Sequence, residues 1–162
     1  MINLVKKEKA GSKYDLLFLG FLKDRHETII EMYKRYFSEL NCKIILVGGI
    51  NQNYKFDKFQ YSSTIMRYED YINIMLKSRA ILDIPQSGQE GLTIRNVEAL
   101  FFKKKLITNN LTVKQYDFYN PNNIFILGYD DQSKIFDFLN SEYVDIDNKI
   151  SEKYELENWI SF

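Results

Sequence analysis

Short apolar runs alternate with amphipathic helical stretches along most of this chain, and this alternation constrains the fold more than any other feature. Each run has the length of a buried strand, and three of the runs are followed directly by glycine. Strands that alternate with helices predict βαβ units and a mainly parallel sheet covered on both faces. We therefore expect an α/β fold, a single Rossmann-like domain of three layers. The predicted strands are residues 14–19, 43–47, 64–66, 80–84, 105–108 and 123–127.

Helical spacing of apolar residues predicts the elements between these strands. The first helix follows Asp24, which has Glu27 three residues later, the spacing of a capping box. Residues 51–63 show no clear period and are predicted to be a loop. The predicted helices cover residues 24–40, 71–78, 92–102 and 135–139, with a last short one at Trp159-Ile160.

Length and composition set the class of protein. A chain of 162 residues suits one domain, which we place at residues 14–162 after a tail or linker at 1–13. The 22 basic and 22 acidic residues cancel, so the usual charge of a nucleic-acid-binding protein is missing. No apolar run reaches the roughly 18 residues of a membrane helix, and no signal peptide is evident. Cys42 is the single cysteine, which excludes an internal disulfide. We expect a cytoplasmic protein.

The carboxyl ends of parallel strands are where ligands bind in such folds. Three predicted loops lie there, at residues 20–25, 48–52 and 85–93. The last of them concentrates glycine, glutamine and serine and leads into a predicted helix. Free N–H groups and the positive end of the helix dipole point into such a loop. Gly88 and Gly91 allow a ligand close to the backbone. This loop is therefore a candidate site for a phosphate-sized anion.

Glu98 lies one to two turns into the helix that follows. With Ile94, Val97 and Phe101 as the buried stripe, Glu98 falls about 40° from Ile94. A carboxylate beside the apolar face needs hydrogen bonds. Ribose hydroxyls are one source, as in dinucleotide sites. An ion pair with Arg95, three residues earlier, is the other, and the two alternatives stay open.

A wider pattern surrounds these residues. Glu90 and Glu98 are separated by seven residues, and Ala99-Leu100 and the strand Lys105-Leu106-Ile107-Thr108 follow. This segment resembles the donor-binding core of retaining GT-B glycosyltransferases of group 1. The wider chain is similar to the glycosyltransferases of bacterial lipopolysaccharide biosynthesis, and it would form the C-terminal, donor-binding half of that fold.

The resemblance implies roles for individual residues. Glu98 would hold the nucleotide ribose, and Glu90, the implied catalytic residue, would contact the hydroxyls of the donor sugar. The backbone amides of Gly91, Leu92 and Thr93 would approach the diphosphate, and Lys23 and Arg25 would neutralise it. Phe21 stands where the family often has arginine, and Arg95 where it often has proline. The remaining residues assigned to donor binding are Gly88, Gln89, Arg95 and Gly48.

The implied activity is retaining transfer of a sugar from a nucleotide diphosphate sugar, in bacterial surface polysaccharide or lipopolysaccharide synthesis. No metal or other cofactor is implied. The implied partners are the donor and an acceptor-binding domain or partner chain, without which we expect nucleotide binding but no turnover. The full enzyme would associate peripherally with the inner face of the membrane. The alternative is a non-catalytic nucleotide-binding module that serves regulation or assembly.

Two further features favour ordinary structural roles. Asp145-Ile146-Asp147 has the D-x-D spacing of metal-dependent sugar transferases, but its place near the C-terminus favours a solvated turn. His26 lies in the first turn of a predicted helix, where a surface position is expected.

Overall fold

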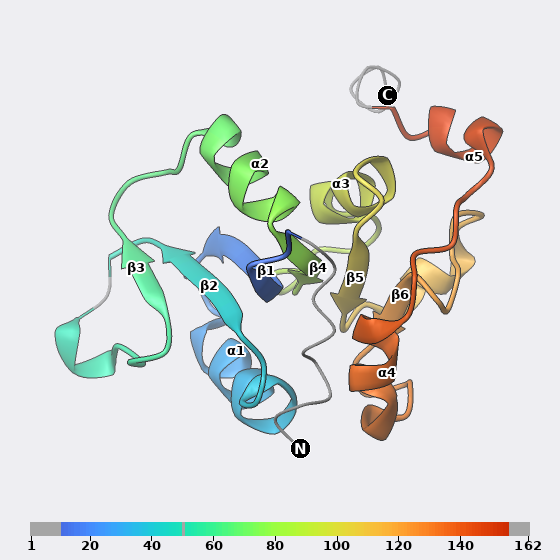
Figure 1. Ribbon diagram of the computed structural model, residues 1–162. Coiled ribbons are helices and arrows are strands. Elements are labelled where there is room, and N and C mark those ends of the chain that lie inside the picture. The colour runs from blue at the N-terminus through green and yellow to red at the C-terminus, as the bar shows by residue number, and fades with distance from the viewer. Residues whose placement is uncertain (1–10, 50, 156–162) are drawn as a thin grey trace. The chain divides into compact units, whose positions relative to one another are not determined.

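The computed structural model describes residues 11–49 and 51–155 of the chain. Its fold class is α/β, as predicted, with parallel strands that alternate with helices (Figure 1). By its internal contacts the chain divides into two compact units. The first unit contains the described residues up to Arg79 together with 86–88, and the second contains 80–85 and the described residues from 89 onward.

Three parallel strands form the sheet of the first unit, in the order β3-β2-β1. Strand β1 (Tyr14–Phe21) pairs with β2 (Cys42–Val47), and β2 pairs with β3 (Gln60–Ser62). The middle residues of β1 and the last four of β2 are buried, which agrees with their apolar sequence. The predicted strands at 14–19 and 43–47 are confirmed.

The edge strand β3 differs from the prediction. A loop was expected at 51–63 and a strand at 64–66, but the strand is Gln60–Ser62, after a short 3-10 turn η2 (Gln52–Tyr54). With three residues, β3 is too short for a hydrophobic period to show. Its position is set by pairing with β2, which continues beyond the ladder where Gly48 N donates to Ser62 O at 2.9 Å.

Helices α1 (His26–Met32) and α2 (Tyr68–Leu76) lie on opposite sides of strands β1 and β2 in Figure 1. A π-helical segment η1 (Tyr33–Phe37) continues α1, so the predicted long helix is present with a wider turn. Apolar side chains spaced along these helices are buried, which gives the unit its core. They are Ile29, Phe37, Tyr71 and Met75.

The second unit repeats this arrangement. The part of β4 (Ser78–Asp83) from Ala80 pairs with β5 (Lys105–Thr108), and β5 pairs with β6 (Ile124–Ile126), all in parallel. Helix α3 (Ile94–Phe101) lies on one side of β5 and β6 in Figure 1, and α4 (Ile135–Asn140) on the other. Three short elements complete the unit: η3 (Leu111–Gln115), η4 (Gln132–Lys134) and α5 (Asn148–Glu152).

The C-terminal part of this unit includes the D-x-D segment. Asp147 caps α5, because its side chain accepts from Lys149 N at 2.9 Å, and Asp145 pairs with Lys103 at 2.7 Å. Both carboxylates therefore have ordinary structural roles, as expected. The predicted helix at Trp159-Ile160 lies outside the described residues. Residues 1–10 of the predicted tail at 1–13 lie outside them too.

Candidate functional site

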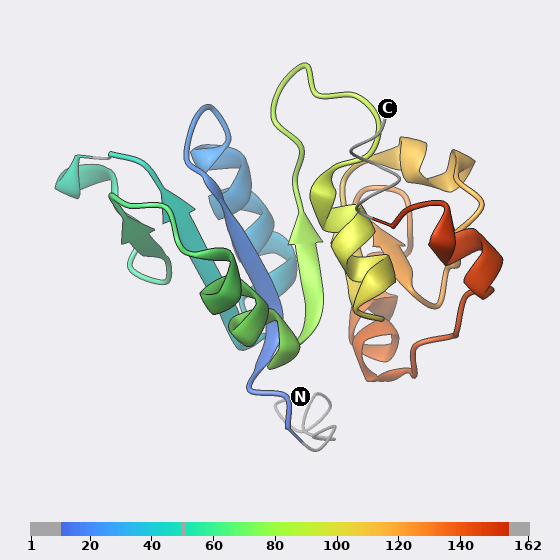
Figure 2. The ribbon, with the colours of Figure 1, turned by 90° about the horizontal axis from the view of Figure 1, so that it is seen from above.

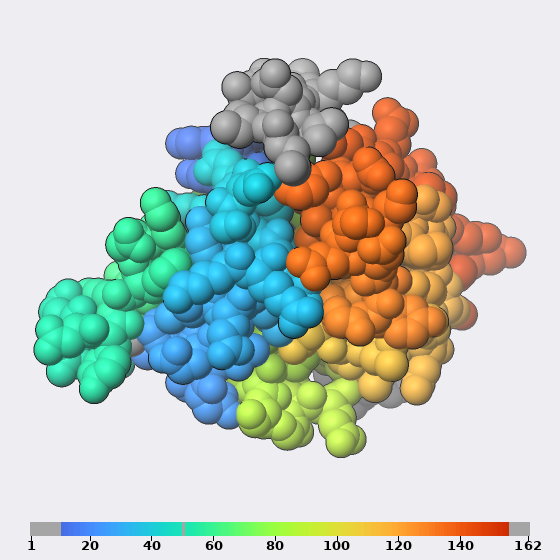
Figure 3. Space-filling model, turned by 90° about the horizontal axis from the view of Figure 1, so that it is seen from below, coloured from blue at the N-terminus to red at the C-terminus, as the bar shows by residue number. Residues whose placement is uncertain are grey.

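The loop between β4 and α3 carries the predicted anion site. Its residues 87–90 are exposed, and Figure 3 shows this part of the chain at the surface in yellow-green. Figure 2 shows the loop rising from the end of β4 before it turns back into α3. Gly88 and Gly91 have φ angles of 79° and 84°, in the left-handed region that glycine adopts without strain. Gln89 and Glu90 lie between these two bends, with their side chains in solvent.

Asp83, just before this loop, is hydrogen-bonded to residues at the other end of the loop. Its side chain, 3% exposed at the end of β4, accepts from Thr93 Oγ1 at 2.8 Å and from Asn96 Nδ2 at 2.9 Å. A third donor is Thr108 Oγ1 at the end of β5, at 3.2 Å. Burial raises the pKa of Asp83 above its usual value, although the hydrogen bonds that the carboxylate accepts act to lower it.

Thr93 is the residue that precedes α3, and its hydroxyl donates to Asp83. It does not cap the helix, and α3 has no side-chain cap at its N-terminus. In the first turn, the Asn96 N–H donates to Thr93 O at 3.1 Å. The positive end of the helix dipole lies at this turn and favours a negatively charged ligand, such as an anion.

Glu98 and Arg95 form an ion pair within α3. Arg95 Nη1 lies 2.6 Å from Glu98 Oε2, and the Glu98 side chain is 1% exposed. The predicted alternative of an i, i+3 pair is therefore confirmed as a contact. It does not exclude a ribose from this carboxylate, since a carboxylate accepts several hydrogen bonds.

The burial of Glu98 has a different cause from the one expected. The stripe of Ile94, Val97 and Phe101 is wrong, because Ile94 is 40% and Phe101 65% exposed. Helix α3 instead buries the consecutive positions 96–100, from Asn96 to Leu100. The polar network at its first turn, through Thr93 and Asn96, rotates the helix so that Asn96 faces Asp83.

Gly91 and Leu92 complete the turn into α3. Gly91 O accepts from Asn110 Nδ2 at 3.1 Å, and a Cβ on Gly91 would lie 3.7 Å from the hydroxyl of Tyr116. Tyr116 is itself stacked on Phe118, with ring centroids 5.6 Å apart. The residues from Gly91 to Glu98 that were assigned to the donor are thus brought together in the second unit.

Lys23 and Arg25, the predicted diphosphate ligands, belong to the first unit. Lys23 has a φ of 35°, which is unusual for a residue with a side chain, and its Nζ lies 5.9 Å from the ring centroid of Phe21. Arg25 Nε donates to Phe21 O at 3.0 Å, and its guanidinium carbon lies 5.2 Å from the ring centroid of Phe18. Arg25 is therefore folded back along the end of β1.

Asp24 does not cap α1, so the predicted capping box is wrong. The helix begins after Arg25 without a side-chain cap. A hydrogen bond from Ser87 lowers the pKa of Asp24. This contact joins the loop after β1 to Ser87 within the first unit.

Gly48, the remaining predicted ligand, ends β2 with a φ of 135°. Nearby, His26 is 9% exposed and its Nε2 lies 2.8 Å from the hydroxyl of Tyr61. The expected surface position of His26 is therefore wrong, because the edge strand β3 covers it. Gly48, like Lys23, Arg25 and Gly88, belongs to the first unit.

Four polar residues of the site were not singled out from the sequence: Asp83, Asn96, Thr108 and Asn110. The signal for three of them was present. Asp83, Thr108 and Asn110 come at or just after the carboxyl ends of two buried strands that are neighbours in the sheet. Such positions gather ligand-binding and supporting groups in α/β folds.

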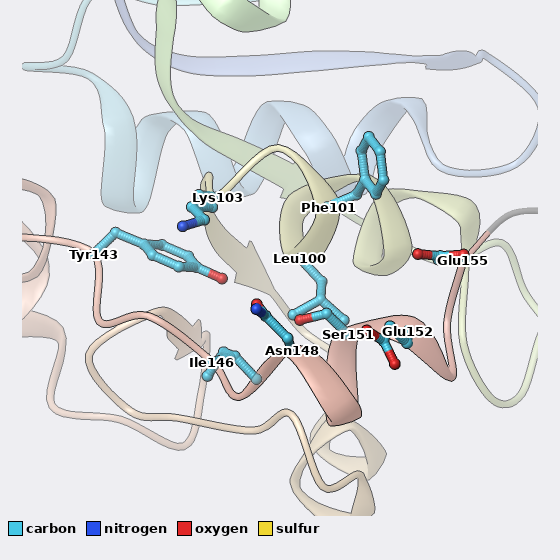
Figure 4. Close-up of a pocket in the computed structure, with 9 residues that line it drawn as sticks. All are labelled: Leu100, Phe101, Lys103, Tyr143, Ile146, Asn148, Ser151, Glu152 and Glu155. Atoms are coloured by element: carbon cyan, nitrogen blue, oxygen red, sulfur yellow. The ribbon is translucent and has the colours of Figure 1, made fainter.

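A separate pocket lies in the second unit, away from these residues. It has a volume of about 230 Å³ and is shown in Figure 4. The side chains that line it come from α3, α5, the segment between α4 and α5, and the residues just after α3 and α5: Leu100, Phe101, Lys103, Tyr143, Ile146, Asn148, Ser151, Glu152 and Glu155. None of the residues assigned to the donor is among them.

A comparison with known protein families finds no match for the chain, and a comparison with curated proteins finds none either. Among residues 11–49 and 51–155, no three His, Cys, Asp or Glu side chains form a group that could hold a metal ion. No helix in the same part of the chain has the length and apolar character needed to cross a membrane.

Proposed function

We propose that this chain binds a nucleotide diphosphate sugar as the donor-binding half of a retaining glycosyltransferase, in bacterial surface polysaccharide or lipopolysaccharide synthesis. One observation carries the proposal. Glu90 and Glu98 lie on either side of the turn that contains Gly91, and their environments differ. Glu90 is exposed in the loop, whereas Glu98 is 1% exposed inside α3. A buried carboxylate next to a glycine-rich turn suits a ligand with both phosphates and hydroxyls.

The diphosphate would bind at the turn that contains Gly91. Gly91 has a positive φ and no side chain, so a ligand can come close to the backbone there. The first turn of α3 has no side-chain cap. The helix dipole adds a positive partial charge there. Charge that develops on the departing diphosphate would be stabilised by these groups.

The two sugar rings of the donor would use the two glutamates. Glu98 would accept hydrogen bonds from the ribose hydroxyls while Arg95 offsets its charge. Glu90, whose side chain is in solvent, would contact the transferred sugar. The alternative function, a non-catalytic nucleotide-binding module, would use the ribose and diphosphate contacts but not Glu90.

The test is a thermal-shift titration with UDP, GDP, ADP and CDP, followed by UDP-glucose, UDP-N-acetylglucosamine and GDP-mannose. At about 100 times its dissociation constant, a ligand adds about 2.7 kcal/mol to the free energy of unfolding, so specific binding raises the melting temperature clearly. We expect stabilisation by at least one nucleotide diphosphate. A chain that none of them stabilises has no donor site, and the proposal is then wrong.

Two variants separate the roles of the glutamates. Glu98→Gln is expected to reduce the shift with nucleotide diphosphate and with nucleotide sugar alike. Glu90→Gln is expected to reduce only the extra shift that the sugar contributes. Glu69→Gln, in the exposed first turn of α2, is the control. If Glu90→Gln leaves every shift unchanged while Glu98→Gln does not, the non-catalytic module is the better assignment.

A further inference from the structure

The strongest feature outside the predicted residues is a chain of hydrogen bonds from the end of β5 to the turn before α3. Asn110 follows β5 and donates through Nδ2 to Gly91 O at 3.1 Å. Its backbone N–H donates to Thr108 Oγ1 at 3.1 Å, and that hydroxyl donates to Asp83. The turn is thereby attached to two strand ends of the second unit, β4 and β5.

The bond to Gly91 O fixes the orientation of one peptide group. In a trans peptide the C=O of one residue and the N–H of the next point in opposite directions, and the six atoms are coplanar. With Gly91 O held against Asn110, the N–H of Leu92 points away from Asn110. Gly91 has a φ of 84° and lacks the Cβ that restricts rotation, so its own preferences fix this plane poorly.

The two residues that support Asn110 from behind are buried. Thr108 is fully buried and Asp83 is 3% exposed. Asn110 is also held on its other side, since its Oδ1 accepts from Thr112 N at 3.1 Å and from Thr112 Oγ1 at 2.7 Å. Both ends of the Asn110 amide are thus engaged, and the Nδ2 group has one direction available.

We propose that Asn110, supported by Thr108 and Asp83, is a positioning residue that aims the Leu92 N–H at the diphosphate of a nucleotide ligand. This inference rests on the proposed function, because the anion is the diphosphate of that donor. Asn110 itself does not touch the ligand. Its contribution is a peptide group already oriented before binding, so that no reorganisation is needed when the anion arrives.

Two substitutions at this position test the inference. Asn110→Ser keeps a side-chain oxygen at the start of η3 but is too short to reach Gly91 O. Asn110→Asp keeps the size and the acceptor for Thr112, and replaces the donor by an oxygen that repels Gly91 O. Asn120 offers the matched control. Its Oδ1 accepts from the N–H two residues later, Asn122 N, at 2.9 Å, as Asn110 Oδ1 does from Thr112 N. Asn120→Ser and Asn120→Asp therefore change the same chemistry elsewhere in the second unit.

The measurement is the dissociation constant, by calorimetry, of whichever of UDP, GDP, ADP and CDP stabilises the wild-type chain. We expect Asn110→Ser to weaken binding roughly tenfold, the effect of about one hydrogen bond to a charged group, and Asn110→Asp to weaken it further. In the absence of nucleotide, the amide resonance of Leu92 is expected to move in both variants. The Asn120 variants should leave both measurements unchanged.

The outcomes distinguish the two proposals. If the wild-type chain binds a nucleotide diphosphate and Asn110→Ser binds it equally well, the positioning role is wrong and the proposed function stands. If Asn110→Ser weakens binding but leaves the Leu92 resonance unmoved, the positioning role is also wrong. If the wild-type chain binds none of the four nucleotides, both proposals fail.

Discussion

Arg95 and Glu98 form a pair of opposite charges one turn apart on α3, with 2.6 Å between Nη1 and Oε2. Their side chains are 21% and 1% exposed, so little water reaches the carboxylate. A second pair with the same spacing joins Arg67, the residue before α2, to Asp70 in the first turn of α2, at 2.9 Å, and these side chains are 76% and 46% exposed. Sequence spacing is identical in the two pairs, but the Arg95–Glu98 pair is far more buried.

Replacing Arg95 is expected to destabilise the protein much more than replacing Arg67. Removal of one partner from a buried pair costs about 3–5 kcal/mol, because a charge is left behind without its counter-ion. Arg95→Met, which keeps the aliphatic stem, should therefore lower the free energy of unfolding by about 3 kcal/mol in urea denaturation. Arg67→Met should have an effect close to the measurement error, since exposed pairs contribute little. Equal losses in the two variants would contradict this account.

The sequence predicted the order of strands and helices well because those elements depend on apolar periodicity. Strands 14–19, 43–47, 80–84, 105–108 and 123–127 all appear, with shifts of a few residues at their ends. Strand β3 was misplaced because three residues at a sheet edge carry no period, and the pairing with β2 decides where it lies.

Apolar periodicity failed to predict which face of α3 is buried. Hydrophobicity alone placed Ile94 and Phe101 inside, whereas the helix turns Asn96 and Glu98 inward and leaves those two exposed. A polar residue at the end of another strand, Asp83, determines this rotation through Thr93 and Asn96. Such a contact spans ten or more positions in the chain, and spacing within one helix cannot reveal it.

Asp83 is expected to make stability depend on pH in an unusual direction. Burial raises its pKa in the folded protein, so the folded carboxyl retains a proton that the unfolded one, with a pKa of about 3.9, has lost. The folded state then binds more protons, and the contribution of Asp83 to stability is largest below about pH 4 and falls as the pH rises through the folded pKa. The measurement is urea denaturation of wild type and Asp83→Asn at several pH values, with the difference between them plotted against pH.

Asp117 provides the opposite case for this experiment. Hydrogen bonds from Lys153 and Tyr154 lower its pKa, so its contribution is present above the unfolded pKa and is lost as the pH falls. The difference between wild type and Asp117→Asn should therefore rise with pH up to about pH 4, whereas that for Asp83→Asn should decline above about pH 4. A difference curve for Asp83→Asn that is flat, or that rises with pH, would show that burial does not dominate at this carboxyl.

Glycine at position 20 is expected to be required for full stability, because Arg25 folds back over the end of β1. A Cβ at position 20 would contact the Arg25 guanidinium and would lie 2.9 Å from the buried ring of Phe18. Gly20→Ala should lower the free energy of unfolding by about 1–3 kcal/mol, the usual cost of overpacking. Adding Arg25→Ala should recover part of that loss, because it removes one of the two obstacles. The comparison is made by thermal or urea denaturation of the single and double variants.

Gly49→Ala is the control for this substitution, since a Cβ there would meet nothing within 4 Å. It should leave stability unchanged or raise it slightly, because alanine reduces the entropy of the unfolded chain. If Gly20→Ala is as harmless as Gly49→Ala, the observed position of Arg25 is not a preferred one.

Cys42 is expected to be chemically inert in the folded protein although it is the single thiol of the chain. Burial raises its pKa to about 12, and its Sγ lies 3.8 Å from Phe37 O. At about pH 8 the reactive thiolate fraction is then roughly a thousandfold smaller than for an unfolded cysteine with a pKa near 8.5. Alkylation by iodoacetamide, followed by mass spectrometry, should be correspondingly slow in buffer and fast in denaturing urea. Because the chain has one cysteine, a single adduct reports the reaction, and a native rate within about tenfold of the unfolded rate would mean that the strand start at Cys42 opens frequently to solvent.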